Sequence, residues 1–361
     1  MSHIIDTFPK PEPDVERLKA ILRREKPDRV PLVELAIAEE VLAALHGEPL
    51  IPLPAHPTAA TLRPWAEQRV RLWWRLGYDY YRVRAEIPFT TARLGAADTA
   101  AAGQRQWVDE HAGMIGSRED LERYAWPRRE DIGFAQAEAA LANLPDGMGG
   151  IGFSGGVLEW ASELLGLEAL SIALYDDPDL VQAVVDRVGQ TIYDAFEQFC
   201  TMDAIVALWL GDDMGFKTAT LISPEHLRTL ILPWHKKYAE LAHRGGRLYL
   251  LHSCGHIEAI MPDLIETVGI DAKHSFEDGI IPVEQFKQTW GDKVAVLGGV
   301  DVDVLSRGSA EQIRERTQQI LEACAPNGGY ACGSGNSVTN YVPAESYMTM
   351  VETIHRFNGR L

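Results

Sequence analysis

The feature that most constrains the fold is a repeated alternation of short apolar runs with longer amphipathic segments. The apolar runs have the length of β-strands, and in the segments between them apolar residues return with helical spacing. This alternation favours a parallel sheet whose strands are connected by helices. The predicted strands begin at about residues 30, 78, 148, 204, 248, 270, 294 and 330.

Eight strands with intervening helices fit a (β/α)8 TIM barrel better than a doubly wound sheet. A doubly wound sheet usually has fewer strands and a phosphate-type glycine loop near its start. We therefore predict an α/β fold in which residues 1–361 form a single barrel domain, with residues 1–29 as an N-terminal extension. Residues 87–118 are predicted to be a lid inserted after the second strand, in which RQWVDEHAGMIG (105–116) indicates a small hairpin.

The composition limits the cellular location and the binding partners that can be expected. With 46% hydrophobic residues the chain can fill a large core, and its formal charge of -18 disfavours nucleic acid and anionic membranes as partners. We expect a cytoplasmic protein, because the sequence shows neither a signal-peptide pattern nor an apolar stretch of ~18 residues. The sequence neither predicts nor excludes a homodimer, since no heptad or apolar stripe indicates an interface.

A histidine and two cysteines at strand ends suggest a metal site. His252 and Cys254 are two apart at the end of the fifth strand, so they share a face, and Cys332 ends the eighth strand. One imidazole and two thiolates suit zinc with a position left for substrate or water. The alternative is that His252 is a core histidine and Cys254 a small buried apolar residue.

Acidic residues at the same edge are candidates for catalysis. Asp212 and Asp213 end the fourth strand and are expected to bind substrate or act as a general base, with a solvated turn as the alternative. Glu277 ends the sixth strand. It is a candidate fourth zinc ligand that leaves when substrate arrives, or else a residue that merely caps its loop.

The substrate-binding candidates lie at other strand ends. They are Glu34 after the first strand, Arg84 on the second, and Asn336 after the eighth. Trp209 is added because it precedes Gly211 and the two aspartates on the fourth strand, whereas the other tryptophans fit core positions better.

Three segments resemble a known family. They are LHSCG, GDDMGFKTATLISPEHLRTLILPWHKKY and GGYACGSGNSVTNYVPAESYMTMVE. They resemble the uroporphyrinogen decarboxylase superfamily, and within it the zinc-dependent, corrinoid-linked methyltransferases, from about residue 15 to the end. The methylcobamide:coenzyme M methyltransferases bind zinc through a His-x-Cys pair and a distant Cys, which the resemblance assigns to His252, Cys254 and Cys332. A carboxylate at Glu277 is also similar to the zinc site of cobalamin-independent methionine synthase.

Two departures shape what the resemblance implies. The decarboxylases carry an arginine-bearing motif after the first strand, but here VELAIAEEVLAALHGEP (33–49) contains no arginine, which disfavours a porphyrinogen substrate. The corrinoid motif Asp-x-His-x-x-Gly is also missing, since the nearest string, 109–113, ends one residue early. Any cobalamin is therefore expected to arrive on a separate corrinoid protein.

The expected activity is zinc-dependent transfer of a methyl group between a small substrate and the cobalt of that corrinoid protein. The substrate is a thiol, which a divalent cation deprotonates, or a methyl ether or alcohol, whose oxygen the cation polarises for O-demethylation. The alternatives are a metal-free lyase like uroporphyrinogen decarboxylase, acting on a tetrapyrrole, and a non-catalytic barrel that binds a corrinoid or tetrapyrrole. Zinc content distinguishes the methyltransferase from the lyase and from the non-catalytic barrel.

Overall fold

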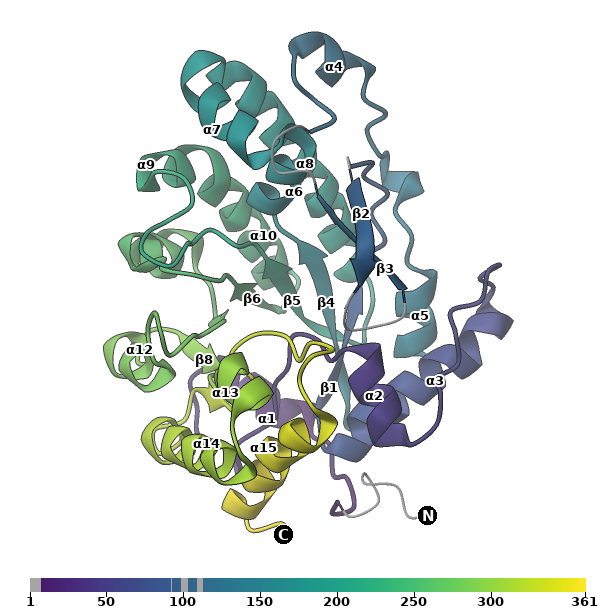
Figure 1. The fold of residues 1–361 in the computed structure, drawn as a ribbon, viewed down its shortest axis with the longest axis vertical. Helices are drawn as coiled ribbons and strands as arrows, with labels where there is room; N and C mark the ends of the chain where they lie inside the picture. The colour runs from purple at the N-terminus through teal and green to yellow at the C-terminus, as the bar shows by residue number, and fades with distance from the viewer. Residues whose placement is uncertain (1–7, 92, 99–102, 109–112) are drawn as a thin grey trace.

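The computed structural model describes residues 8–91, 93–98, 103–108 and 113–361, and side chains outside 92–112. Its centre is a parallel sheet in the order β1-β4-β5-β6-β7-β8-β9. The strands are β1 (Tyr80–Arg84), β4 (Gly149–Gly155), β5 (Ile205–Gly211), β6 (Leu248–His252), β7 (Ala272–His274), β8 (Ala295–Leu297) and β9 (Tyr330–Ala331). The seven strands predicted from residue 78 onward are confirmed, and the curled sheet lies inside a layer of helices (Figure 1).

The helices connect successive strands. In chain order they are α1 (Val15–Leu22), α2 (Glu39–His46), α3 (Ala59–Leu76), α4 (Arg118–Arg123), α5 (Ala135–Leu141), α6 (Val157–Leu165), α7 (Leu167–Asp176), α8 (Pro178–Phe199), α9 (Pro224–His226), α10 (Leu232–Arg244), α11 (Met261–Asp263), α12 (Val283–Trp290), α13 (Val302–Arg307), α14 (Ala310–Cys324) and α15 (Ala344–Phe357). Short 3-10 turns η2 (Arg129–Asp131) and η4 (Glu258–Ile260), and π turns η3 (Leu227–Ile231) and η5 (Leu264–Val268), extend some of them. In the part of the chain that is described, no helix is long and apolar enough to cross a membrane.

Residues 30–37 occupy the position of the predicted first strand, but they do not form a regular strand. They pair with the β9 side only through isolated bridges at Leu32 and Ile37. On the other side, the Glu34 amide donates to the Tyr80 hydroxyl at 2.8 Å, and that hydroxyl donates to the Glu34 carbonyl at 2.6 Å. The strand predicted to begin at about residue 30 is therefore irregular, because Pro31 has no amide hydrogen and a side chain takes the place of a backbone partner.

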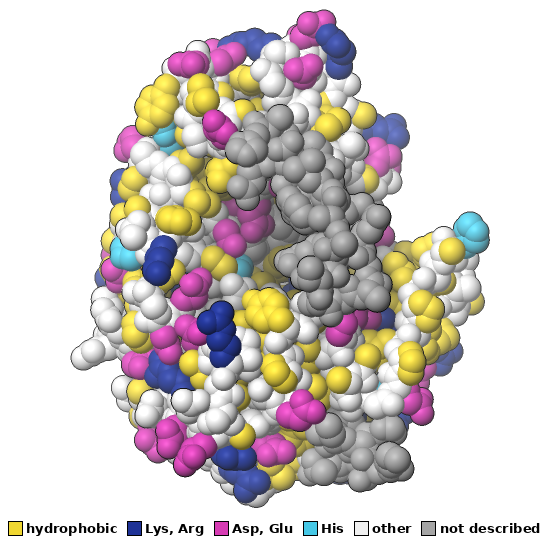
Figure 2. Space-filling model, viewed as in Figure 1, with side chains coloured by type: hydrophobic (Ala, Val, Ile, Leu, Met, Phe, Trp, Pro, Cys, Tyr) yellow, Lys and Arg dark blue, Asp and Glu magenta, His cyan; other side chains and the backbone are white. Residues whose placement is uncertain are grey.

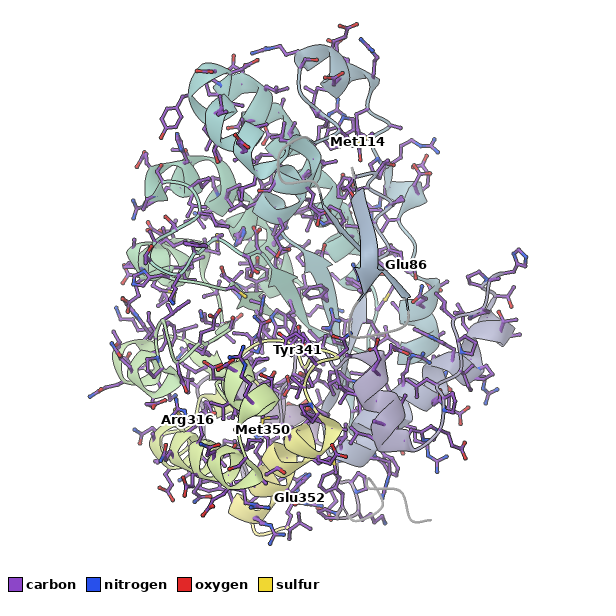
Figure 3. The ribbon with its side chains drawn as sticks, in the orientation of Figure 1. Glu86, Met114, Arg316, Tyr341, Met350 and Glu352 are labelled. Carbon is purple, nitrogen blue, oxygen red and sulfur yellow. The ribbon has the colours of Figure 1, made fainter. Side chains whose placement is uncertain are left out.

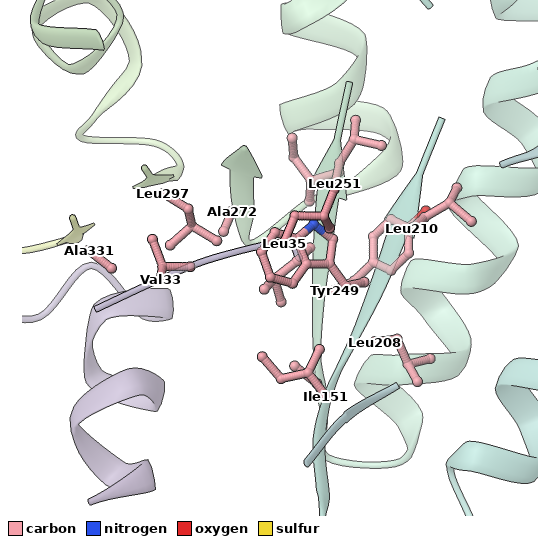
Figure 4. Packing of buried hydrophobic residues seen from close by; sticks show 14 of the residues in the cluster. Val33, Leu35, Ile151, Leu208, Leu210, Tyr249, Leu251, Ala272, Leu297 and Ala331 are labelled. Carbon is pink, nitrogen blue, oxygen red and sulfur yellow. The ribbon is translucent and has the colours of Figure 1, made fainter. Parts of the chain in front are cut away.

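Strands in the middle of the sheet are buried on both faces because helices cover the sheet. In β5, Leu208, Trp209 and Leu210 are all fully buried, and core side chains from β4 to β8 pack against one another (Figure 4). In β4, a Cβ at Gly152 would lie 2.7 Å from the ring of Phe199 in α8, so glycine lets that helix approach the sheet closely. This packing fixes the strand ends that carry the polar residues discussed below.

The N-terminal helix α1 contacts the amino ends of the strands. The Val15 amide donates to the Gly147 carbonyl at 2.8 Å, just before β4. Arg17 donates to Asp79, just before β1, at 2.7 Å and to Asp28 at 2.6 Å. The N-terminal segment therefore packs at the end of the sheet opposite the predicted site.

A two-stranded antiparallel hairpin follows β1 in the sequence. It consists of β2 (Arg93–Asp98) and β3 (Gly103–Val108), and Arg93 pairs with Val108. The hairpin predicted over 105–116 therefore begins earlier in the chain, and residues 109–112 of that prediction lie outside the described residues.

Candidate metal centre

Three side chains from two neighbouring strand ends form a group that is able to hold a metal ion. One ligand atom each of Asp213, His252 and Cys254 lies within 4.8 Å of the others. His252 Nε2 is 3.4 Å from the Cys254 sulfur and 3.4 Å from Asp213 Oδ1. The strand register explains the meeting, because Gly211 of β5 pairs with His252 of β6, so the residues that follow both strands emerge side by side.

The loops after β5 and β6 are held together by their own backbones. The Cys254 amide donates to Asp213 Oδ1 at 2.8 Å, and the Gly215 amide donates to the Cys254 carbonyl at 3.1 Å. A Cβ at Gly215 would lie 2.6 Å from that carbonyl oxygen, and Gly255 has a φ of +79°, so both loops need glycine. Asp213 and Cys254 are thereby fixed relative to each other without a metal.

Two donors from other strands point at the Cys254 sulfur. Asn336 Nδ2 lies 3.1 Å from it, and the Ser275 hydroxyl lies 3.3 Å from it. Burial, and then the Asp213 carboxylate, raise the pKa of the Cys254 thiol to about 12. A divalent cation would reverse this effect, since it stabilises the thiolate and neutralises the neighbouring carboxylate. The donor set therefore fits a metal ion such as zinc, which accepts imidazole, thiolate and carboxylate ligands.

His252 is held in a defined position by a second histidine. Its Nδ1 lies 2.7 Å from Nδ1 of His274, with the ring centroids 5.0 Å apart. Burial lowers the pKa of His252 to about 3, helped by the charges of Lys273 and Arg82, and burial also lowers the pKa of His274. Both rings are therefore neutral, so His252 has a lone pair available on one nitrogen.

A cavity of about 770 Å³ lies beside this group. Asn336, which contacts the Cys254 sulfur, lines it together with Glu277 and Tyr341, an exposed residue in the connection between β9 and α15 (Figure 3). Burial and the nearby Asp301 and Asp213 charges raise the pKa of Glu277. Figure 2 shows that this face is hollowed near its centre and that acidic side chains gather there.

The structure does not bring Cys332 into the group. Cys332 is fully buried in the seam with residues 30–37, where its amide donates to the Pro31 carbonyl at 2.9 Å. Its pKa is raised to about 12, mainly by burial, and its side chain lies beside Tyr330. The turn that follows brings Asn336 to the Cys254 sulfur in its place. Cys332 therefore lies outside the group formed by Asp213, His252 and Cys254.

Asp212 also differs from its expected role. Its carboxylate is fully buried and accepts from the first amides of α6, those of Val157, Leu158 and Glu159, at 3.0 to 3.3 Å. His235 of α10 lies 2.7 Å from its Oδ2 atom. Asp212 therefore anchors two helices to β5, and neither oxygen is available for catalysis.

Three predicted substrate-binding residues do not reach the cavity. Glu34 is fully buried, accepts from the Ser334 amide at 2.8 Å and contacts the Ser334 hydroxyl. Trp209 is fully buried, with its ring in edge contact with His274 at 5.3 Å. Arg84 is exposed at the end of β1. Of the four candidates, Asn336 alone lines the cavity and touches the group.

The sequence interpretation missed two residues of this region. Glu159, in the first turn of α6, has its pKa raised to about 8 by burial and by the charges of Asp212 and Asp213. Lys273 of β7 is buried, and its pKa is lowered to about 8, mainly by burial, despite the opposing charges of Cys254, Asp213 and Glu277. Their only signal in the sequence was their position at or just beyond a strand end.

The fold and the site define a parallel α/β protein with a candidate metal centre at the carboxyl ends of its strands. The family model described as uroporphyrinogen decarboxylase (URO-D) matches residues 14–357. The chain belongs to this family, as its sequence segments indicated.

Some relatives are named methyltransferases and others uroporphyrinogen decarboxylases. The chain is 28% identical over 174 residues to the methylated-thiol–coenzyme M methyltransferase of Methanosarcina mazei, a match that covers 48% of this chain and 45% of that protein. It is 22% identical over 340 residues to the uroporphyrinogen decarboxylase of Cupriavidus pinatubonensis, covering 85% and 84% of the two chains. A solved methyltransferase structure from Methanosarcina mazei has a TM-score of 0.72 at 18% identity, covering 96% of this chain and 99% of that chain, and it supports the fold.

Proposed function

We propose that the protein is a zinc-dependent methyltransferase that moves a methyl group between a small substrate and the cobalt of a separate corrinoid protein. The observation that carries the proposal is the convergence of His252 Nε2, Cys254 Sγ and an Asp213 oxygen, which are ligands that zinc accepts. The similarity to a methylated-thiol methyltransferase supports the reaction class. The substrate is a thiol or a methyl ether or alcohol.

The residues around the group have distinct roles in this proposal. Bound zinc would supply a Lewis acid that holds a thiol as thiolate or polarises an ether oxygen. Asn336 and Ser275 donate to the Cys254 sulfur and restrain its position. Glu159, with its pKa raised to about 8, holds a proton at neutral pH and is proposed as a proton source near Asp213.

We also propose how the sheet closes and how the chain is divided into domain, extension and lid. Residues 30–37 complete the sheet as the eighth strand position of a closed (β/α)8 barrel, supported by the bridges at Leu32 and Ile37. Residues 1–361 form one domain, residues 1–29 are its N-terminal extension, and the β2–β3 hairpin belongs to a lid over residues 87–118. The corrinoid protein docks at the carboxyl ends of the strands, because the methyl group must reach the cavity lined by Glu277 and Asn336.

A decarboxylase-like lyase is the second candidate. The relative from Cupriavidus pinatubonensis matches most of the chain and is named a uroporphyrinogen decarboxylase. Such a lyase has no need of the thiolate and imidazole ligands. The missing arginine in residues 33–49 argues against it.

The test is methyl transfer with methylcob(III)alamin as the donor and thiols as acceptors. The conversion to cob(I)alamin is followed by visible absorbance under anaerobic conditions. The zinc-loaded protein is expected to demethylate the cofactor with at least one small thiol, and Cys254→Ala is expected to lose this activity. Cys324→Ala, a buried cysteine of α14, is the matched control. Turnover of uroporphyrinogen by metal-free protein would contradict the proposal.

A further inference from the structure

A serine just after β7 has a backbone conformation that residues with a side chain rarely adopt. Ser275 has a φ of +91°, and among the residues that the structure describes Arg24 is the only other non-glycine residue with a positive φ. Arg24 is exposed just after the end of α1, where a left-handed residue is common. Ser275 is buried after a strand, so neighbouring groups must hold it in this conformation.

The conformation of Ser275 places a hydroxyl beside the candidate metal centre. That hydroxyl donates to the Cys254 sulfur at 3.3 Å. The residues on either side are fixed, because His274 is the last residue of β7 and the Phe276 amide donates to the Gly335 carbonyl at 2.8 Å. The chain therefore turns from the strand into its loop at Ser275.

Lys273 of β7 holds the carbonyl of the same serine. Its Nζ atom donates to the Ser275 carbonyl oxygen, and the lysine side chain is buried. The ammonium lies 4.1 Å from the ring centroid of Phe276 and 5.4 Å from that of Phe286 in α12. A buried ammonium requires hydrogen-bond acceptors. The acceptor here belongs to the residue whose hydroxyl contacts Cys254.

Lys273 does not itself face the metal centre. Successive side chains of a strand point to opposite faces, and the next residue, His274, contacts His252 on the inner face of the sheet. Lys273 therefore points to the helix side of the sheet, in agreement with its contact to Phe286. Burial lowers the pKa of Lys273 to about 8, so most of it is cationic at neutral pH. Its effect on Cys254 runs through Ser275, or through space by its charge.

We propose that Lys273 is a positioning residue, which holds the Ser275 carbonyl and thereby keeps Ser275 in the left-handed conformation that directs its hydroxyl at the Cys254 sulfur. A hydrogen bond to a ligating thiolate withdraws electron density from the sulfur, so a bound metal ion becomes a stronger Lewis acid. The inference rests on the proposed function, in which Cys254 is a metal ligand. It adds a residue that acts on this ligand from the other face of the strand.

A set of variants separates the hydrogen bond from the charge. Ser275→Ala removes the hydroxyl, and Lys273→Met removes both donor and charge while its thioether packs against the two phenylalanine rings. Lys273→Gln keeps a donor without the charge, and the double variant combines Ser275→Ala with Lys273→Met. Lys287→Met is the matched control, because Lys287 of α12 also donates to a backbone carbonyl, that of Gly328, at 2.7 Å.

The first measurement is the absorption spectrum of the protein loaded with Co²⁺ in place of zinc. Charge transfer from the Cys254 thiolate to cobalt gives a near-ultraviolet band, which should move to longer wavelength in Ser275→Ala and by a similar amount in Lys273→Met. The double variant should show no larger shift, Lys273→Gln a smaller one and Lys287→Met none. An unshifted band in Lys273→Met, or additive shifts in the double variant, would overturn the proposal.

The second measurement needs no metal and separates this inference from the proposed function. Alkylation of Cys254 by iodoacetamide is followed in metal-free protein at about pH 8, by mass spectrometry of the peptide that contains it. The Ser275 hydroxyl stabilises the thiolate, so Ser275→Ala and Lys273→Met should each slow the reaction about 2- to 5-fold, with no further loss in the double variant.

The outcomes of the two measurements are distinct. This pattern of alkylation rates without a cobalt band in the unmodified protein would contradict the metal centre and still support the positioning role of Lys273. Equal losses in Lys273→Met and Lys273→Gln would show that the charge of the lysine acts through space, and would overturn the positioning role. So would alkylation of Lys273→Met at the rate of the unmodified protein.

Discussion

His252 Nδ1 and His274 Nδ1 lie 2.7 Å apart inside the sheet, and both rings are neutral. One of the two nitrogens must therefore carry the hydrogen. If His252 offers the Nε2 lone pair to a metal, its Nδ1 carries the hydrogen and donates it to His274. His274 is then a positioning residue that selects the tautomer and the ring orientation of His252.

Replacing His274 should weaken metal binding without removing a ligand. In His274→Leu the His252 Nδ1–H loses its acceptor, so zinc affinity should fall about 10- to 100-fold. His274→Gln can supply an amide oxygen and should retain more of the affinity. Competition with a chromophoric zinc chelator measures the zinc affinity of both variants. Equal affinities for the Leu variant and the unmodified protein would contradict the positioning role.

Adjacent aspartates should respond differently to the same substitution. Asp212 holds the first turn of α6 and contacts His235, so Asp212→Asn should lower the free energy of unfolding by about 2–4 kcal/mol. Asp213 is partly exposed and bonds to one amide, so Asp213→Asn should cost about 1 kcal/mol or less and act mainly on metal affinity. Urea unfolding of the metal-free proteins measures the loss of unfolding free energy in each variant. A reversed order of the two losses would contradict the assignment.

Glu34 should make stability depend on pH. The Ser334 hydroxyl is placed to donate to the Asn336 carbonyl at 2.5 Å, so its contact with Glu34 requires a proton on the carboxyl group. In agreement, burial raises the pKa of Glu34 from 4.5 to about 8. Between these values the native state binds more protons than the unfolded state, so the contribution of Glu34 to stability is full below pH 4.5 and is lost as pH rises through about 8.

The test is Glu34→Gln, which cannot titrate. The free energy of unfolding of the unmodified protein should fall relative to that of the variant, by about 1–4 kcal/mol, between pH 5 and pH 8. Glu40→Gln, at an exposed position of α2, is the control and should leave the pH profile unchanged. Parallel profiles for the unmodified protein and Glu34→Gln would indicate that Glu34 is charged in the folded chain.

The sequence predicted most of the sheet because strands such as β5 and β6 are buried on both faces and are apolar along their length. It predicted His252 and Cys254 as neighbours because residues two apart on a strand share a face, and that rule holds across one strand end. It could not predict which of Asp212 and Asp213 turns toward His252 and Cys254, since two neighbouring residues after a strand differ only in the direction of their side chains. The loop contacts set that direction.

The same limit explains Cys332 and Arg84. Cys332 and Asn336 are separated by Gly333 and Gly335, and the path of the chain through two glycines is not predictable from side-chain chemistry. Arg82 and Arg84 share a face of β1, and the sequence interpretation chose Arg84. The register of β1 with β4 places Arg84 beside Phe153, at the last position of the strand, where it is exposed.

We propose that Asp213, His252 and Cys254 hold the metal while Cys332 does not. The most direct test is zinc content by mass spectrometry of protein prepared anaerobically with zinc supplied. We predict about one zinc per chain in the unmodified protein and in Cys332→Ala, and loss of zinc in Cys254→Ala and Asp213→Ala. Loss of zinc in Cys332→Ala with retention in Asp213→Ala, or absence of zinc from every variant and from the unmodified protein, would contradict the account.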